Sequence, residues 1–285
     1  MPETASTPPL TPPASVARWL QWGEAQLSGR VDRPRLEAQI LLASAIKRDR
    51  LWLMAHPEAA IDPGSYPDWI AQRADAQPLE YLTGRVGFYS REFIITPGVL
   101  IPRPETELLI DRALAAIATS QAPRIAEIGT GSGVIAIVLA LLRTDAEIVA
   151  TDINPKAIAL ARENAALHGV ADRIAFVQGS LLDGVGGPFD LLISNPPYIA
   201  SDAPLDPCVL KEPYEALFGG AAGHELLFQI IDSACAQRVG YLACECGYDQ
   251  RAVLERYLAD KRVSEVEFYQ DYAQLQRGFV ARIDD

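Results

Sequence analysis

The chain has 285 residues, of which 49% are hydrophobic, so it can bury the core of one large domain and of a smaller one. The formal net charge is -12 at pH 7 and the sequence contains no basic stripe, which disfavours a nucleic acid as a direct partner. The longest apolar run, Val134–Leu142, is far shorter than the roughly 20 residues that cross a bilayer, which disfavours a membrane partner.

The N-terminal segment, residues 1–14, is rich in Pro, Thr and Ser. Because proline cannot join a helix interior and little of the segment is apolar, we expect it to be disordered. It has no basic region followed by an apolar one, so it does not read as a signal peptide. Together with the short apolar runs, this predicts a cytoplasmic protein.

Residues 15–77 predict a small helical domain. Apolar side chains recur at helical spacing from Ser15, and a second helix is expected from Pro34, because proline suits the first helical turn. Residues 78–103 predict a linker in which the period changes to two. The stretch VGFYSREFIIT within it predicts a β-hairpin with its turn near Ser90 and Arg91.

Residues 104–285 alternate between strand and helix patterns, beginning with a helix in which Pro104 occupies the first turn. Seven strand patterns follow, and a long loop is expected from Pro196 to about Gly223. Regular alternation of strand and helix predicts an α/β fold, a Rossmann-like, mostly parallel seven-stranded sheet. The last two strands have no helix between them, so one of them is expected to be antiparallel.

The cysteines and histidines do not show the spacing of a metal site. The four cysteines form no CxxC pair, and the three histidines are far apart in the sequence. Cys244 and Cys246 alternate within an apolar run, which favours unpaired side chains in a core. No metal is therefore expected.

A glycine-rich turn, EIGTGSG, lies between a predicted strand and a predicted helix at residues 127–133. Its glycines permit a tight turn and a close approach of the backbone to a ligand. The spacing GxGxG differs from that of dinucleotide enzymes, and no P-loop lysine follows. Asp152 ends the next strand, where a carboxylate can bind ribose hydroxyls. A ligand-free turn is the alternative, but the paired features favour a nucleoside site.

A second motif, NPPY at residues 195–198, follows the strand pattern FDLLIS. Ligands of open α/β sheets bind beyond the carboxyl ends of the strands. The Asn195 side-chain oxygen and the Pro196 carbonyl can accept two hydrogen bonds from one planar NH2 group, while Tyr198 stacks on it. Since the amide nitrogen of glutamine is a poor nucleophile, holding both N–H bonds favours its pyramidal form. The alternative is a rigid loop without function.

These motifs resemble those of amino-group methyltransferases that use S-adenosylmethionine. The stretches QPLEYLTGRVGFYSREFIITPGVLIPRPETELLI, EIGTGSGVIAIVLA and ISNPPYI are similar to those of the peptide chain release factor glutamine methyltransferases, the PrmC or HemK family. The likeness extends from about Arg33 to the C-terminus. It implies a Rossmann-like methyltransferase domain that methylates the glutamine of the Gly-Gly-Gln motif in class 1 release factors, its partners, with a helical substrate-recognition domain. S-adenosylhomocysteine would be the product.

The resemblance also implies roles for individual residues. Asp152 would hold the ribose of the cofactor, and Asn195 would touch both cofactor and substrate. Ser180 and Leu181 are expected beside the adenine, where this chain departs from the family pattern with Gly179-Ser180-Leu181. The other implied cofactor contacts are Gly129, Thr130, Gly131, Ser132 and Gly133; the implied catalytic and substrate-gripping residues are Asn195, Pro196, Pro197 and Tyr198, with Arg103 and Glu105 at the entrance.

The sequence leaves several alternatives open. Arg103 either lines the entrance or packs at a helix start, and Glu127 either positions the cofactor or is a solvated strand end. A methyltransferase for glutamine in ribosomal protein L3 is a close rival. DNA adenine methylation is a more distant one, and a non-catalytic binding module belongs to another class altogether.

Overall fold

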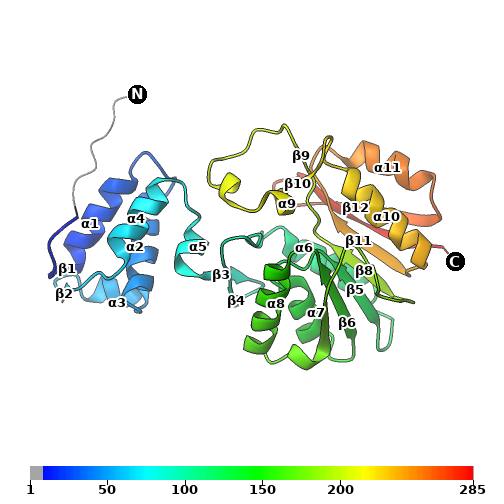
Figure 1. Ribbon diagram of the computed structural model, residues 1–285, viewed down its shortest axis with the longest axis horizontal. Helices are drawn as coiled ribbons and strands as arrows, with labels where there is room; N and C mark the ends of the chain where they lie inside the picture. Colours follow the sequence, from blue (N-terminus) through cyan, green and yellow to red (C-terminus); the bar gives the residue numbers. More distant parts are fainter. Residues whose placement is uncertain (1–8, 285) are drawn as a thin grey trace. The chain divides into compact units, whose positions relative to one another are not determined.

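The structure, a computed structural model, describes residues 9–284 and divides the chain into two compact units (Figure 1). Unit 1 consists of the described residues up to Gly84 together with Asp206–Lys211, and unit 2 of Arg85–Leu205 and the chain from Glu212 onward. Residues 1–8 of the segment expected to be disordered lie outside the described part. Within the same segment, Ala14 pairs with Ile61 in a short antiparallel ladder of β1 (Ala14–Ser15) and β2 (Ala60–Ile61).

Unit 1 is helical, as predicted. Trp19, Leu42 and Tyr66 are fully buried at its centre, where helices too short to be stable alone pack on one another. The Ser15 side chain caps the first helix by accepting a hydrogen bond from the Arg18 backbone N–H. The helices are α1 (Val16–Leu27), α2 (Pro34–Ala45), α3 (Arg50–Ala55), α4 (Tyr66–Ala74) and the unpredicted α5 (Leu79–Thr83).

The predicted hairpin is confirmed. β3 (Arg85–Phe88) pairs antiparallel with β4 (Arg91–Ile94). Tyr89 and Ser90 form the turn with φ angles of 50° and 57°. Two consecutive residues with positive φ match the twist of a two-residue hairpin. The Tyr89 backbone N–H donates to the Glu107 carboxylate at 2.7 Å, which ties the turn to the helix that follows.

Unit 2 contains a seven-stranded sheet in the order β12-β13-β11-β8-β5-β6-β7. The five strands from β11 to β7 run parallel, and β13 is antiparallel to both of its neighbours, as the missing helix predicted. The strands are β5 (Arg124–Ile128), β6 (Glu147–Asp152), β7 (Ile174–Gln178), β8 (Leu191–Ser194), β11 (Tyr241–Glu245), β12 (Val263–Gln270) and β13 (Gln276–Ile283).

Helices cover both faces of this sheet. Successive strand residues point to opposite faces, so Glu127 of β5 faces α7 while Ala126 packs in the cluster formed by α10 and α11. On the first face α6, α7 and α8 lie side by side (Figure 1). The helices are α6 (Thr106–Ala116), α7 (Val134–Leu142), α8 (Pro155–Leu167), α10 (Glu225–Gln237) and α11 (Arg251–Ala259).

Two predicted boundaries are wrong. α6 begins at Thr106, because Pro104 lies in the preceding turn, in which the Thr106 N–H donates to the Arg103 carbonyl. The expected loop from Pro196 to Gly223 contains short elements, which lack the length to show a period. These are the strand β9 (Ile199–Ala200), the 3-10 turn η2 (Val209–Lys211), the short helix α9 (Tyr214–Leu217) and the strand β10 (Phe218–Gly220). Another 3-10 turn, η1 (Ala171–Arg173), precedes β7.

No helix within residues 9–284 combines the length and the apolar character that crossing a bilayer requires.

Candidate active site

The glycine-rich loop begins where β5 ends. Gly129, Gly131 and Gly133 have φ angles of 74°, 56° and 85°, a region that side chains disfavour. A Cβ built on Gly129 would meet nothing within 4 Å, and one on Gly131 would only touch Val99 at 4.0 Å. The loop backbone therefore borders open space in which a ligand can approach it closely. Gly133 differs, because its Cβ would lie 3.0 Å from the Ala161 side chain.

Asp152 ends the neighbouring strand and holds the loop. Its two carboxylate oxygens accept hydrogen bonds from the backbone N–H groups of Gly131 and Asn154, each at 2.9 Å. Burial raises the pKa of Asp152, while both backbone hydrogen bonds act in the opposite direction and Glu215 adds to the rise. Each oxygen keeps a lone pair for a further donor. The carboxylate is therefore fixed at the pocket wall and can accept hydroxyl groups.

Glu127 lies beneath this loop and is fully buried, so its interpretation as a solvated strand end is wrong. One carboxyl oxygen accepts from the Thr130 hydroxyl at 2.8 Å and from the Ala136 backbone N–H at 3.1 Å. The other oxygen has no hydrogen-bond partner among the described residues. Burial raises the pKa of Glu127 to about 8, against the lowering effect of both hydrogen bonds. At neutral pH the carboxyl group is mostly protonated.

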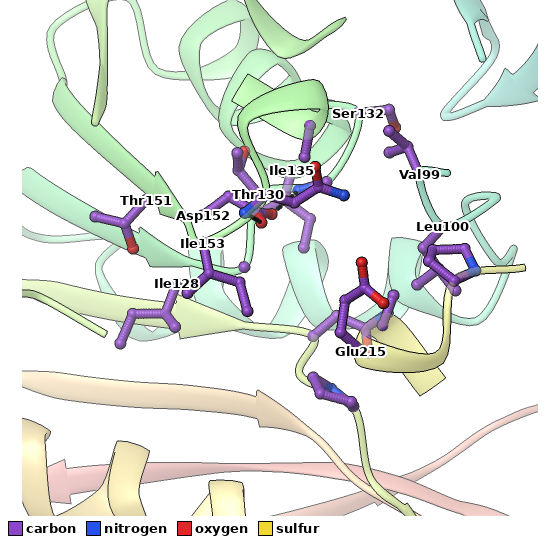
Figure 2. A pocket seen from close by; sticks show the side chains of 18 of the residues that line it. Val99, Leu100, Ile128, Thr130, Ser132, Ile135, Thr151, Asp152, Ile153 and Glu215 are labelled. Atoms are coloured by element: carbon purple, nitrogen blue, oxygen red, sulfur yellow. Dashed lines mark hydrogen bonds between the residues drawn. The ribbon is translucent and has the colours of Figure 1, made fainter. Parts of the chain in front are cut away.

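These features surround a pocket of about 1070 Å³, part of it open to solvent, at the carboxyl ends of β5, β6 and β8. This is the point where the strand order reverses on either side of β5, the usual ligand site of such sheets. Asp152 and Glu215 reach the pocket from different elements (Figure 2). The apolar part of its lining includes Val99, Leu100, Ile128, Ile135, Ile153 and Leu181.

The segment after β7 also lines the pocket, with Gly179, Ser180 and Leu181. Leu181 has a φ angle of 49°, which is unusual for a branched side chain. The Thr151 hydroxyl donates to the Leu181 carbonyl at 2.7 Å and holds this conformation. The segment that departs from the family pattern therefore still forms a wall of the pocket.

The NPPY loop follows β8 and is tied to neighbouring strands. The Asn195 side-chain NH2 donates to the Thr106 hydroxyl at 2.9 Å, and that hydroxyl donates to the Glu245 carboxylate at 2.7 Å. The Tyr198 hydroxyl donates to the other oxygen of Glu245 at 2.9 Å. Asn195 and Pro197 line the pocket, whereas Pro196 is buried and Tyr198 directs its hydroxyl into the protein.

Two glycines lie in close contact with the backbone of the NPPY loop. A Cβ on Gly219 would lie 2.4 Å from the Pro197 carbonyl oxygen, and one on Gly223 would lie 2.5 Å from that of Tyr198. Neither position admits a side chain. The segment around β10 therefore fixes the shape of the NPPY loop from outside the sheet.

Arg103 and Glu105 do not line the pocket. The Arg103 guanidinium pairs at 2.5 Å with Glu212, whose side chain is only 2% exposed and also accepts from the Ile101 N–H. Glu105 precedes α6 and lies 4.0 Å from the Arg277 guanidinium. The structure thus supports packing at the start of the helix for Arg103. A role at the entrance stays a prediction for both residues.

Thr106 and Glu245 were not among the residues that the motifs predicted. Glu245 is an acidic residue at the end of the otherwise apolar strand YLACE, and an acid in such a position is a sequence signal of a special role. Cys244 and Cys246, on either side of it, are fully buried in the core. Within residues 9–284, His, Cys, Asp and Glu side chains form no group of three that could hold a metal ion.

Comparison with known proteins identifies the family. The PrmC N-terminal domain model matches residues 18–84, and the Methyltransferase small domain model matches residues 104–210. The release factor glutamine methyltransferase of Chlorobaculum tepidum is 38% identical over 267 residues, covering 87% of this chain and 90% of its own. That of Moorella thermoacetica is 39% identical over 265 residues, covering 89% and 93%. This chain belongs to the release factor glutamine methyltransferase family.

Family membership confirms the methyltransferase class and the Rossmann-like fold that the motifs predicted. Among solved structures, the N-terminal domain of human METTL16 in complex with SAH (S-adenosylhomocysteine) aligns with a TM-score of 0.53 at 19% identity, over 68% of this chain and 76% of that one. At this level of identity the likeness supports the fold alone. The helical residues matched by the PrmC N-terminal model end at Gly84, where unit 1 also ends in the first part of the chain.

Proposed function

We propose that this protein transfers the methyl group of S-adenosylmethionine to the side-chain amide nitrogen of a glutamine, the one in the Gly-Gly-Gln motif of class 1 release factors. The family relation over most of the chain supports the substrate, because the relatives carry the name release factor glutamine methyltransferase. The arrangement of the pocket and the NPPY loop supports the chemistry.

The pocket suits a nucleoside with a cationic centre. Gly129 leaves the room that a Cβ would fill, so the backbone can lie against the ligand. Asp152 presents a carboxylate to ribose hydroxyls, and the apolar side chains beside Leu181 suit a purine ring. Asp152 and Glu215 also give the pocket a negative character that favours a cation. S-adenosylmethionine, when bound, supplies a methyl carbon on a positively charged sulfur, which a nitrogen lone pair can attack.

The NPPY loop provides the acceptors for the substrate amide. Because the Asn195 NH2 group is engaged by Thr106, the Asn195 side-chain oxygen is left to accept one N–H bond of the glutamine. The Pro196 carbonyl would accept the other N–H bond. Two acceptors that hold both N–H bonds favour a pyramidal nitrogen, whose lone pair would attack the methyl carbon as its bond to sulfur breaks and S-adenosylhomocysteine leaves. The nitrogen, positively charged once the new bond forms, would then release one proton to solvent. No strong base is then required.

The orientation of Asn195 is the observation that carries this proposal. Asn195 lines a nucleoside-sized pocket beyond the carboxyl end of β8, and because its NH2 group donates to Thr106, its oxygen is the atom left to meet a donor. A site built around an acceptor is matched to an NH2 donor such as the glutamine amide. DNA adenine also carries an NH2 group, but the net charge of -12 disfavours a polynucleotide.

Mass spectrometry tests the reaction directly. A purified class 1 release factor is incubated with the protein and S-adenosylmethionine, and we expect one added methyl group on the glutamine of Gly-Gly-Gln. A release factor in which that glutamine is replaced by alanine is the matched control and should gain none. Methylation of ribosomal protein L3 but not of the release factor would reverse the substrate assignment while keeping the chemistry.

Asn195→Ala tests the mechanism. Removal of an acceptor that acts in the transition state should lower turnover roughly a hundredfold or more while the fold and cofactor binding persist. Circular dichroism and calorimetry with S-adenosylmethionine measure these two controls. Near-normal turnover in this variant would refute the role of the Asn195 oxygen.

A further inference from the structure

A buried carboxylate lies behind the candidate active site and is not part of the proposed chemistry. Glu245 ends β11 beside β8, with a relative exposure of 1%. No lysine or arginine among the described residues forms an ion pair with it. Its two oxygens each accept one hydroxyl proton, from Thr106 and from Tyr198. Such a residue needs a reason, because burial of a carboxylate is costly.

Stability is a poor reason. Replacement of buried charged groups by apolar residues of similar volume is often neutral or stabilising, so a chain that needed only packing here would not use an acid. What the Glu245 carboxyl group provides, and an apolar side chain does not, is a separate acceptor oxygen for each of two hydroxyl groups. In the structure both neighbouring hydroxyl groups direct their protons at Glu245.

This constraint passes from Glu245 to Asn195 through Thr106. A threonine hydroxyl has one proton, and at Thr106 that proton is committed to Glu245. The Thr106 oxygen can then only accept a hydrogen bond. The Asn195 atom that contacts it must consequently be the NH2 nitrogen, at 2.9 Å, and the Asn195 oxygen is turned away from Thr106.

We propose that Glu245 is a positioning residue that sets the direction of the hydrogen bonds through Thr106 and so holds the Asn195 side-chain oxygen toward the substrate amide. The inference rests on the proposed function. Without the carboxylate, the Thr106 proton is free to turn to the Asn195 oxygen. The Asn195 side-chain amide would then rotate and present its NH2 group to the NH2 group of the substrate glutamine. Neither NH2 group can accept a hydrogen bond from the other.

Glu245 also holds the far end of the same loop. The Tyr198 hydroxyl donates to it, and the Tyr198 carbonyl accepts from the Gln250 side chain at 2.8 Å. Burial raises the pKa of Glu245, whereas both hydroxyl bonds and the charge of Arg277 act in the opposite direction. One carboxylate therefore restrains both the first and the last residue of the NPPY loop.

A matched pair of variants at Thr106 separates the hydrogen bonds from packing. Thr106→Val keeps the shape of the side chain but removes the hydroxyl, and Thr106→Ser keeps the hydroxyl but removes the methyl group. We expect Thr106→Val to lower kcat about tenfold to a hundredfold, with little change in the KM for the release factor or in cofactor affinity, and Thr106→Ser to recover most of the loss. Thr119→Val, on an exposed residue outside the site, serves as the control.

Glu245→Leu should lower kcat at least as much as Thr106→Val, because it also removes the acceptor of the Tyr198 hydroxyl. Adding Thr106→Val to Glu245→Leu should lower kcat little further, since the hydrogen bonds through Thr106 are already broken. Independent, multiplying losses would overturn the inference. So would a Thr106→Ser protein as slow as Thr106→Val, because packing would then explain the effect. The unaltered protein is measured in the same assay. If it fails to methylate the release factor, that result rejects the proposed function rather than the role of Glu245.

A spectroscopic measurement judges the relay without reference to activity. The chain has three asparagines, so selective ¹⁵N-asparagine labelling gives three side-chain NH2 signals, and Asn195→Ala identifies the one that disappears. We expect the Asn195 signal to be protected from solvent exchange in the unaltered protein, and to shift and exchange faster in Glu245→Leu. An Asn195 signal that is unchanged in Glu245→Leu would overturn the inference, whatever substrate the protein methylates.

Discussion

Replacing Glu127 by glutamine should make the free energy of unfolding fall less as the pH rises. The buried carboxyl of Glu127 has its pKa raised to about 8 from an ordinary value of 4.5. A raised carboxyl pKa means that the folded state binds the proton more tightly than the unfolded state. Its contribution to stability is therefore fully present below about pH 4.5 and is lost as the pH rises toward about 8.

The magnitude follows from the pKa. Each tenfold change in proton affinity is worth about 1.4 kcal/mol, so a rise from 4.5 to about 8 limits the total loss to about 5 kcal/mol. Between about pH 5 and pH 8 the loss would be roughly 3 kcal/mol. Glutamine at position 127 keeps the oxygen that accepts from Thr130 and Ala136 and carries no titratable proton. It resembles the protonated glutamate and avoids this loss.

Urea denaturation of both proteins at several pH values measures the effect. Other carboxyl groups titrate alike in the two proteins, so their contributions cancel in the difference. We expect similar free energies of unfolding near pH 5 and an advantage for Glu127→Gln that grows by roughly 3 kcal/mol by about pH 8. A difference that is constant across this range would show that Glu127 does not titrate there, and the argument from burial would be wrong.

Three further variants test the supports of the site. Gly133→Ala should lower the free energy of unfolding by about 2 kcal/mol or more in urea titrations, since residue 133 has a φ of 85° and its Cβ would lie 3.0 Å from the Ala161 side chain. Unchanged stability would contradict this. Arg103→Ala should lower the free energy of unfolding by about 2 kcal/mol in the same titrations, because it leaves Glu212 buried without its partner. An equal loss in a Glu212→Gln background would exclude the ion pair as the cause. Asn164→Ala should lower the Tm by about 8 °C in calorimetry, because the fully buried Asn164 side chain forms hydrogen bonds with the β4 backbone and with the glycine loop. An unchanged Tm would show that these hydrogen bonds are dispensable.

Local signals explain why the elements could be predicted. Pro34 and Pro155 stand at the first positions of α2 and α8, and the helix after the glycine loop is buried on all sides, as its continuous apolar pattern indicated. The antiparallel last strand followed from the absence of a crossover helix. α5 was missed because five residues between Pro78 and Gly84 are too few to show a helical period.

The motifs likewise predicted the place of the candidate site. The glycine loop, Asp152 and Asn195 each follow a parallel strand, and the carboxyl ends of such strands meet at one edge of the sheet. The spacing of residues along the chain thus determined the fold class, the position of the pocket and the family resemblance.

What only the tertiary structure decided is which side chains meet and in which protonation state. Thr106, Asn195 and Glu245 are separated by up to 139 positions, and hydrogen bonds join them only because α6 packs on β11 and β11 pairs with β8. The burial of Glu127 likewise depends on α7 covering its face of the sheet. A sequence pattern specifies local conformation and the buried face of each element, but the direction of a hydrogen bond and the pKa of a carboxyl depend on groups brought together from distant parts of the chain.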